Sequence, residues 1–234
     1  MKSSSIKKYT LFFGLITLLD LIAVQVGFPI LHTLAKSLLM PVLAAFLYNS
    51  GLAGTKKLVL IGIFFSWWGD IFLLMDIPGS FYFIAGLASF LTTHLLYIFY
   101  FLSIKKQAPS LLKKQPIWFI LIIGYGVGLV ILLLPHLGEL KIPVALYATV
   151  ISSMLLCSLH IFYKTNPPAN KFFVVGAILF VLSDSLLAFN KFYQTFSMAS
   201  VGIMLTYCLA QYFIVRGCVT LDSSTNLTHS NRTV

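Results

Sequence analysis

The sequence predicts an all-α membrane protein, a polytopic bundle of eight transmembrane helices. Of its 234 residues 59% are hydrophobic and only 9% are charged, which leaves too little polar surface to cover a soluble globule of this size. Nearly the whole chain consists of apolar runs of about 17–23 residues, close to the length that a helix needs to cross a bilayer. We therefore expect an integral membrane protein with no separate soluble domain.

The expected spans are separated by short polar breaks and turn signals. In chain order they cover residues 9–28, 30–48, 58–75, 81–102, 116–134, 142–163, 171–189 and 196–216. Pro78-Gly79 has the chemistry of a tight turn, so the third and fourth spans should be antiparallel neighbours. We expect one domain over residues 1–217, followed by a Ser/Thr/Asn-rich cytoplasmic tail over 218–234 that should be disordered.

The second span carries a proline at position 41. Pro41 cannot donate a backbone hydrogen bond, so the carbonyl of Ser37 loses its usual helical partner. The sequence therefore predicts a kink near Lys36.

The net charge of +10 reflects membrane topology rather than nucleic-acid binding, because the lysines lie in small clusters between the spans. With the N-terminus inside, thirteen basic residues fall on the cytoplasmic side, whereas only Lys141 and Lys191 fall on the other. The cytoplasmic set is Lys2, Lys7, Lys8, Lys56, Lys57, Lys105, Lys106, Lys113, Lys114, Lys164, Lys171, Arg216 and Arg232. This bias predicts that both termini are cytoplasmic.

The cysteines predict neither a disulfide framework nor a metal site. Cys157, Cys208 and Cys218 all lie within or at the end of apolar spans, without metal-ligand spacing. We expect no cofactor and no metal.

One phrase with a buried aspartate occurs twice. Asp70 lies in Trp-Trp-Gly-Asp-Ile-Phe-Leu-Leu, and Asp184 lies in Leu-Ser-Asp-Ser-Leu-Leu, 114 positions later. In both, a small residue precedes the aspartate and a pair of leucines follows it, at the third and fourth places after Asp70 and at the second and third places after Asp184. This short repeat predicts two parallel four-helix halves, with the two carboxylates facing one central cavity.

Four charged residues should form one layer inside the membrane. With a rise of about 1.5 Å per residue, Asp20, Lys36, Asp70 and Asp184 lie about 9–12 Å below the outer edge. Three acids and one base cannot all form ion pairs, so at least one carboxylate should be protonated or solvated by a water-filled cavity. Carboxylates in unequal environments can act as an acid and a base.

Further polar residues extend this site. His94 and Tyr97 share one face of the fourth span, and Tyr207 and Gln211 share one face of the eighth, where they would line a deeper wall. Asn190-Lys191 would lie at the outer mouth, where a lipid head group could bind.

Each of these residues also has a structural interpretation. Asp70 and Asp184 could pair with Lys36 or cap a re-entrant backbone, and His94 could be an interhelical hydrogen-bonding residue. The aromatic residues, Trp67 among them, are most simply lipid-facing or interfacial.

The combined phrases resemble the YhhN-type lysoplasmalogenase family of eight-helix membrane proteins. The resemblance rests on the two aspartate phrases, the Ala-Lys-Ser-Leu-Leu-Met-Pro phrase at Lys36, and Tyr207-Cys-Leu-Ala-Gln-Tyr. In that family the lysine is commonly followed by proline, whereas this chain has Ser37. The resemblance implies an integral protein of a bacterial inner membrane.

It also implies hydrolysis of the vinyl ether of a lysoplasmalogen to a fatty aldehyde and a glycerophospho-amine. Vinyl ethers hydrolyse by protonation of a carbon and capture of the oxocarbenium ion by water, which suits a pair of carboxyl groups. The implied partners are a lysophospholipid and the bilayer. Asp70 and Asp184 would be catalytic, and the expected substrate-binding residues are Lys36, His94, Tyr97, Asn190, Lys191, Tyr207, Gln211 and Asp20.

Two other classes also fit intramembrane aspartates. An intramembrane aspartyl protease uses such a pair, but its usual Gly-x-Gly-Asp phrase is broken here by Trp67. A proton-coupled transporter fits the internal repeat and the buried acids.

Overall fold

The computed structural model describes residues 3–51, 54–75, 77, 81–105 and 108–230, and within these ranges it is helical with no strand. Eight helical segments are long and apolar enough to cross a membrane, as the sequence predicts. The long helices are α1 (Ser3–Val26), α2 (Pro29–Asn49), α3 (Lys56–Leu74), α4 (Tyr82–Leu102), α6 (Ile117–Leu133), α7 (Lys141–His160), α8 (Ala169–Ala188) and α9 (Ala199–Ser230).

Short helical turns connect some of these helices. The α5 segment (Leu111–Lys114) precedes α6, and the 3-10 turns Leu134–His136 and Gly138–Leu140 lead into α7. A further 3-10 turn, Phe162–Lys164, follows α7, and a π-helical turn, Phe189–Tyr193, ends α8. The tight turn predicted at Pro78-Gly79 lies outside the described residues.

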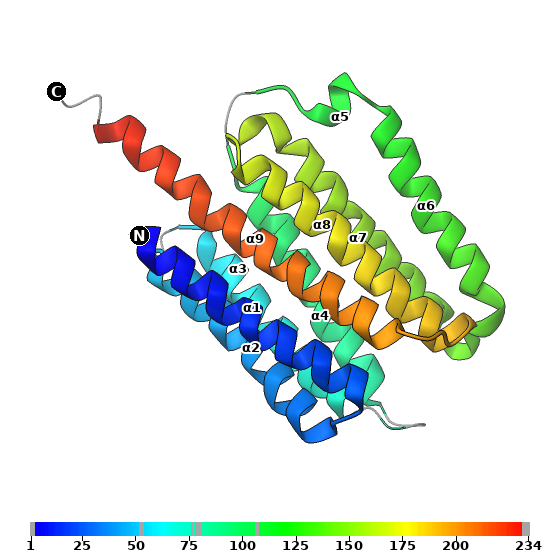
Figure 1. Ribbon diagram of the computed structural model, residues 1–234. Coiled ribbons are helices and arrows are strands. Elements are labelled where there is room, and N and C mark those ends of the chain that lie inside the picture. The colour runs from blue at the N-terminus through cyan, green and yellow to red at the C-terminus, as the bar shows by residue number, and fades with distance from the viewer. Residues whose placement is uncertain (1–2, 52–53, 76, 78–80, 106–107, 231–234) are drawn as a thin grey trace.

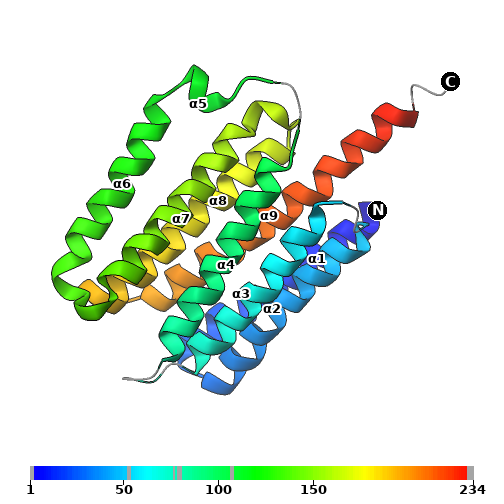
Figure 2. The same ribbon diagram turned by 180° about the vertical axis from the view of Figure 1, so that it is seen from behind.

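The bundle is built from pairs of neighbouring helices. Helix α3 packs along α4, α8 along α9 and α1 along α2, while α4 also packs on α7 and α9 packs on α1 and α2 (Figure 1). Helix α6 lies at the outside of the bundle against α7, which is clear in the view from behind (Figure 2). The α3–α4 and α8–α9 pairs share the most extensive contacts, and we call them the two central helix pairs.

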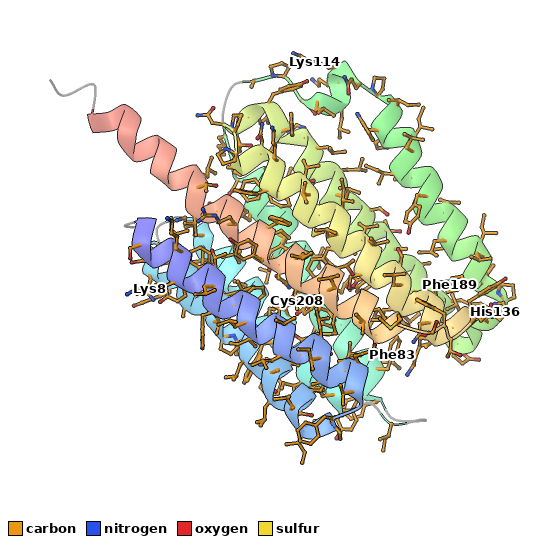
Figure 3. The ribbon with its side chains drawn as sticks, in the orientation of Figure 1. Lys8, Phe83, Lys114, His136, Phe189 and Cys208 are labelled. Atoms are coloured by element: carbon orange, nitrogen blue, oxygen red, sulfur yellow. The ribbon has the colours of Figure 1, made fainter. Side chains whose placement is uncertain are left out.

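The two ends of the bundle differ in chemistry. Figure 3 places Lys8 and Lys114 at one end, Phe83, His136 and Phe189 at the other, and Cys208 near the middle. We call the lysine-bearing end the inner end, following the predicted topology.

Two glycines allow the central helix pairs to approach closely. A Cβ atom on Gly62 of α3 would lie 2.6 Å from the ring of Tyr97 on α4. A Cβ atom on Gly176 of α8 would lie 2.8 Å from the side chain of Ile214 and 3.0 Å from the carbonyl oxygen of Ala210, both on α9. Gly176 follows Gly62 by 114 positions, the same spacing that separates the two aspartate phrases.

Pro41 lies within α2, which continues to Asn49. The carbonyl oxygen of Ser37, expected to lack a helical partner, accepts a hydrogen bond of 2.9 Å from the indole Nε1–H of Trp67 on α3. Trp67 is therefore half-buried and bonded to a neighbouring helix, which corrects the expectation that it simply faces lipid. The kink near Lys36 stays a prediction.

Helix α9 continues beyond the expected end of the domain. Cys218 and Val219 are buried in the main core, so packing extends past residue 217. The backbone stays helical to Ser230. Whether residues 218–234 act as a separate tail stays a prediction.

Candidate active site

Asp70 lies near the C-terminal end of α3 and is fully buried. One carboxylate oxygen, Oδ1, is 3.8 Å from the Nζ atom of Lys36 on α2. The other, Oδ2, accepts a hydrogen bond of 2.7 Å from the hydroxyl of Tyr207 on α9. Three helices therefore meet at this carboxylate, and Lys36 supplies the cation that a buried ionised aspartate needs.

Asp20 of α1 lies beside this group. Its Oδ1 atom is 2.8 Å from Nδ1 of His32, at the start of α2, and the Asp20 side chain is completely buried. Asp20 and His32 are both close enough to Asp70 to interact with it electrostatically. We call Asp20, His32, Lys36, Asp70 and Tyr207 the Asp70 cluster.

Asp184 of α8 has different partners. Its Oδ2 atom accepts a hydrogen bond of 2.5 Å from the hydroxyl of Tyr147 on α7, and lies 3.2 Å from Nε2 of His94 on α4. Nε2 of His94 is also 2.9 Å from the Tyr147 hydroxyl. The Nδ1 atom of His94 is buried with no hydrogen-bond partner in the described part of the chain. These three residues form the Asp184 cluster.

A third network lies between α3, α4 and α9. The hydroxyl of Tyr97 donates a 2.7 Å hydrogen bond to Oε1 of Gln211, and Nε2 of Gln211 donates one of 2.7 Å to Oγ of Ser66. Ser66 in turn donates to the hydroxyl of Thr93. His94 and Tyr97 were expected to line one wall, but His94 belongs to the Asp184 cluster and Tyr97 to this network.

Aromatic rings lie between the two carboxylate clusters. The ring of Tyr207 packs edge-on against Phe90 and Phe180, with centroids 5.7 Å and 5.6 Å apart. Phe180 packs in the same way against His94. The cavity that Asp184 lines together with Tyr147 and Phe90 does not include Asp70 among its lining residues. The single cavity expected to join both carboxylates therefore stays a prediction, without a direct contact to support it.

Asn190 and Lys191 lie in the π-helical turn at the outer end of α8. The Lys191 Nζ atom lies 4.8 Å from the ring centroid of Phe83, and Phe83 lines the Asp184 cavity. Asn190 accepts a hydrogen bond from the backbone N–H of Phe196. Lys191 thus lies near Phe83 at the rim of the Asp184 cavity, and Asn190 bonds to the backbone within its own turn. That either residue binds a head group stays a prediction.

Sequence reasoning did not find four residues of the site. His32 and Tyr147 belong to the two carboxylate clusters, and Ser66 and Thr93 belong to the third network. Ser66 precedes Asp70 by four positions, so helical spacing could have placed it on the same face. Tyr147 precedes Asp184 by 37 positions, close to the 34 that separate Lys36 from Asp70. The 114-position repeat itself matches Lys36 with Val150, however, so the spacing alone does not single out Tyr147.

The region that contains both clusters matches a known protein family. A sequence model of the YhhN family matches residues 31–218. The chain belongs to the YhhN family. Every residue of the two clusters except Asp20 lies within the matched region, and Asp20 precedes it.

Two curated proteins show what this YhhN chain is similar to. "Lysoplasmalogenase TMEM86B" from Homo sapiens is 33% identical over 183 residues, which cover 77% of this chain and 72% of the human protein. "Lysoplasmalogenase" from Mycobacterium tuberculosis is 31% identical over 138 residues, 58% of this chain and 50% of that protein. The match thus spans half the length of the mycobacterial relative. No solved structure matches this chain.

Proposed function

We propose that this protein hydrolyses the vinyl-ether bond of lysoplasmalogens, with Asp70 and Asp184 as its acid–base groups. The observation that carries the proposal is the pair of carboxylates inside the membrane, each held by a tyrosine hydroxyl and a basic side chain from other helices. Burying a charged side chain at this depth of the membrane costs free energy, and such residues usually serve a function. Relatives named lysoplasmalogenases supply the reaction class.

The reaction needs one proton donor, one proton acceptor and one water molecule. A carboxylic acid transfers its proton to the β-carbon of the vinyl ether, and the electron pair of the C=C bond forms the new C–H bond. Water adds to the resulting oxocarbenium carbon while a carboxylate accepts its proton. The hemiacetal then collapses to a fatty aldehyde and the free hydroxyl of the glycerophospholipid, and the proton returned to the protein balances the one that was spent.

The two clusters offer different surroundings for these two tasks. Lys36 lies within salt-bridge distance of Asp70, whereas Asp184 contacts a tyrosine hydroxyl, that of Tyr147, and the ring of His94. Unequal surroundings are what allows two carboxyl groups of one protein to act as an acid and a base.

We also propose that both termini are cytoplasmic and that the protein resides in a bacterial inner membrane. The thirteen-to-two distribution of Lys and Arg supports this orientation. Reporter fusions that place the C-terminus outside would contradict it.

The decisive experiment measures aldehyde release from a lysoplasmalogen by the purified protein. Asp70→Asn and Asp184→Asn should each lower kcat by about 10²–10⁴-fold, because Asn keeps the size of the side chain and removes the acid–base group. The double variant should lose little more than the weaker single variant, since both groups serve one reaction. Because Asp70→Asn leaves Lys36 without its counter-ion, unfolding in detergent should first show that each variant is folded.

Glu139→Gln provides a matched control, because it removes an exposed carboxylate from the outer turn between α6 and α7. This variant should keep wild-type turnover. Retained turnover in both folded aspartate variants would show that the carboxylates are structural. Counterflow uptake into vesicles, without aldehyde release, would favour the transporter class instead.

A further inference from the structure

An apolar groove lies between α2 and α3, on the inner side of the Lys36–Asp70 pair. All of its lining side chains are apolar or aromatic, and Pro41 and Ala44 of α2 face Ile61, Phe64 and Trp67 of α3 across it. Its volume is about 460 Å³. That is within the usual size range of a small-molecule site.

The groove is open to the lipid around the bundle. Ile61 and Phe64 are exposed large apolar residues and Pro41 is exposed, whereas Ala44 is half-buried at the floor. An apolar molecule can therefore enter it sideways from the bilayer without crossing water.

The outer end of the groove points toward the Asp70 cluster, although neither Lys36 nor Asp70 is among its lining residues. Trp67, which closes this end, lies three residues before Asp70 and so on the same side of α3. Its indole bonds to the carbonyl of Ser37, the residue after Lys36. From Lys36 to Ala44 the helix rises about 12 Å, which sets the length of apolar wall that runs inward from the charged pair.

We propose that this groove holds the single hydrocarbon chain of the lysolipid substrate, with its vinyl-ether end at Lys36 and Asp70. This inference rests on the proposed function. A lysolipid has a single chain, and this groove runs inward from the level of the charged pair. Its direction also matches a lipid whose head group lies at the outer surface and whose chain points to the membrane centre.

This placement makes the enzyme sensitive to chain length at one position. Ala44 lies about 12 Å of helix rise from Lys36, so a large side chain there shortens the groove and leaves its outer end intact. Ala44→Phe should raise KM for long-chain lysoplasmalogens by about 10–100-fold, because several methylene groups lose their buried site. Its kcat for a short-chain substrate should stay within about twofold of the wild-type value.

Ala88→Phe is the matched control. Ala88 is an exposed alanine on α4, outside the groove, so the same substitution there should change neither constant. If Ala44→Phe keeps the wild-type KM for every chain length while the wild-type protein is active, the groove does not hold the chain and the inference is wrong.

A binding measurement separates this inference from the proposed reaction. The chain has three tryptophans, so Trp68→Phe combined with Trp118→Phe leaves Trp67 as the single fluorophore in the groove. The probe is a saturated 1-O-alkyl lysophospholipid, brominated near its ether end, which cannot be cleaved as a vinyl ether. Bromine quenches tryptophan fluorescence on contact. If the probe binds in the groove, Trp67 emission should fall and reach a plateau at a low mole fraction of the probe. Adding Ala44→Phe should weaken that effect.

A brominated diacyl phospholipid serves as the reference lipid. Quenching that is linear in mole fraction and equal for both lipids would mean that only bulk lipid occupies the groove, and it would overturn the inference. Saturable quenching without any aldehyde release would support the groove as a lysolipid site and refute the proposed reaction.

Discussion

Asp70 and Asp184 occupy corresponding places in the two central helix pairs. Asp70 is on α3, the first helix of the α3–α4 pair, and Asp184 is on α8, the first helix of the α8–α9 pair. Each carboxylate contacts one residue on the helix that precedes its pair and one residue on the second helix of the other pair. For Asp70 these are Lys36 of α2 and Tyr207 of α9. For Asp184 they are Tyr147 of α7 and His94 of α4.

The difference lies in what the partners can do. The Asp70 side chain is 2% exposed and lies within salt-bridge distance of Lys36, whereas the Asp184 side chain is 15% exposed and contacts no Lys or Arg within salt-bridge distance in the described part of the chain. Two carboxylates at corresponding positions of similar helix pairs can therefore have different surroundings. The correspondence supports the predicted two-half architecture, which itself stays a prediction.

Lys36→Met should produce the largest difference between the clusters. It leaves Asp70 buried without its cation, and breaking a buried ion pair in this way lowers the free energy of unfolding by about 3–5 kcal/mol. His94→Gln should cost less, because Asp184 is the more exposed of the two carboxylates. Unfolding in detergent would measure both. Adding Asp70→Asn to Lys36→Met should restore part of the loss, and a double variant as unstable as Lys36→Met would show that the pair is not the cause.

Tyr207→Phe and Tyr147→Phe test the hydroxyl donor that the two clusters share. Each variant removes one hydrogen bond to a carboxylate, worth about 1.5–3 kcal/mol of unfolding free energy. The Tyr207 variant should lose more, because Asp70 is the more deeply buried carboxylate. Tyr125→Phe, which removes the exposed 2.8 Å hydrogen bond to Ser185, is the control and should lose less than either. Equal losses in all three would contradict a special role for the two buried donors.

Gly176→Ala and Gly62→Ala compare the packing of the two helix pairs and should have the smallest effects, about 1–3 kcal/mol each. The added methyl group meets backbone atoms of α9 in the first case and the ring of Tyr97 in the second. Gly176→Ala should be the more destabilising, since a backbone cannot rotate away. Gly124→Ala in α6, where no atom lies within 4 Å, should be neutral or stabilising, and thermal unfolding would rank the three variants. A Gly62 loss larger than the Gly176 loss would reverse the comparison.

The sequence was sufficient for the parts of this protein that depend on composition and spacing along one helix. Apolar run lengths predicted all eight spans, and the expense of burying charge predicted that Lys36 would lie near an aspartate. The freed carbonyl of Ser37 followed from the missing N–H of Pro41 alone, although its indole partner did not.

Contacts between helices were harder to predict, because they depend on how far each helix is rotated and shifted. His32 follows the loop between the first two spans and reads as an interfacial residue, yet the antiparallel pairing of α1 and α2 brings it to Asp20. Tyr147 is one of eleven tyrosines, and only packing of α7 against α4 and α8 selects it. Phe180, whose ring contacts Tyr207 of the Asp70 cluster and His94 of the Asp184 cluster, could not be placed between the clusters from the sequence either.

The position of α6 outside the bundle bears on how freely its sequence can change. Its span has the highest mean hydropathy of the eight, 2.7, and only 6% of that stretch is buried, compared with 50% for the span of α9. Lipid chains adapt to any apolar surface, so one aliphatic side chain on the lipid-facing sides of α6 can replace another with little effect. We expect random apolar substitutions to be accepted along most of α6 and rejected along α9, where each side chain must fit fixed neighbours.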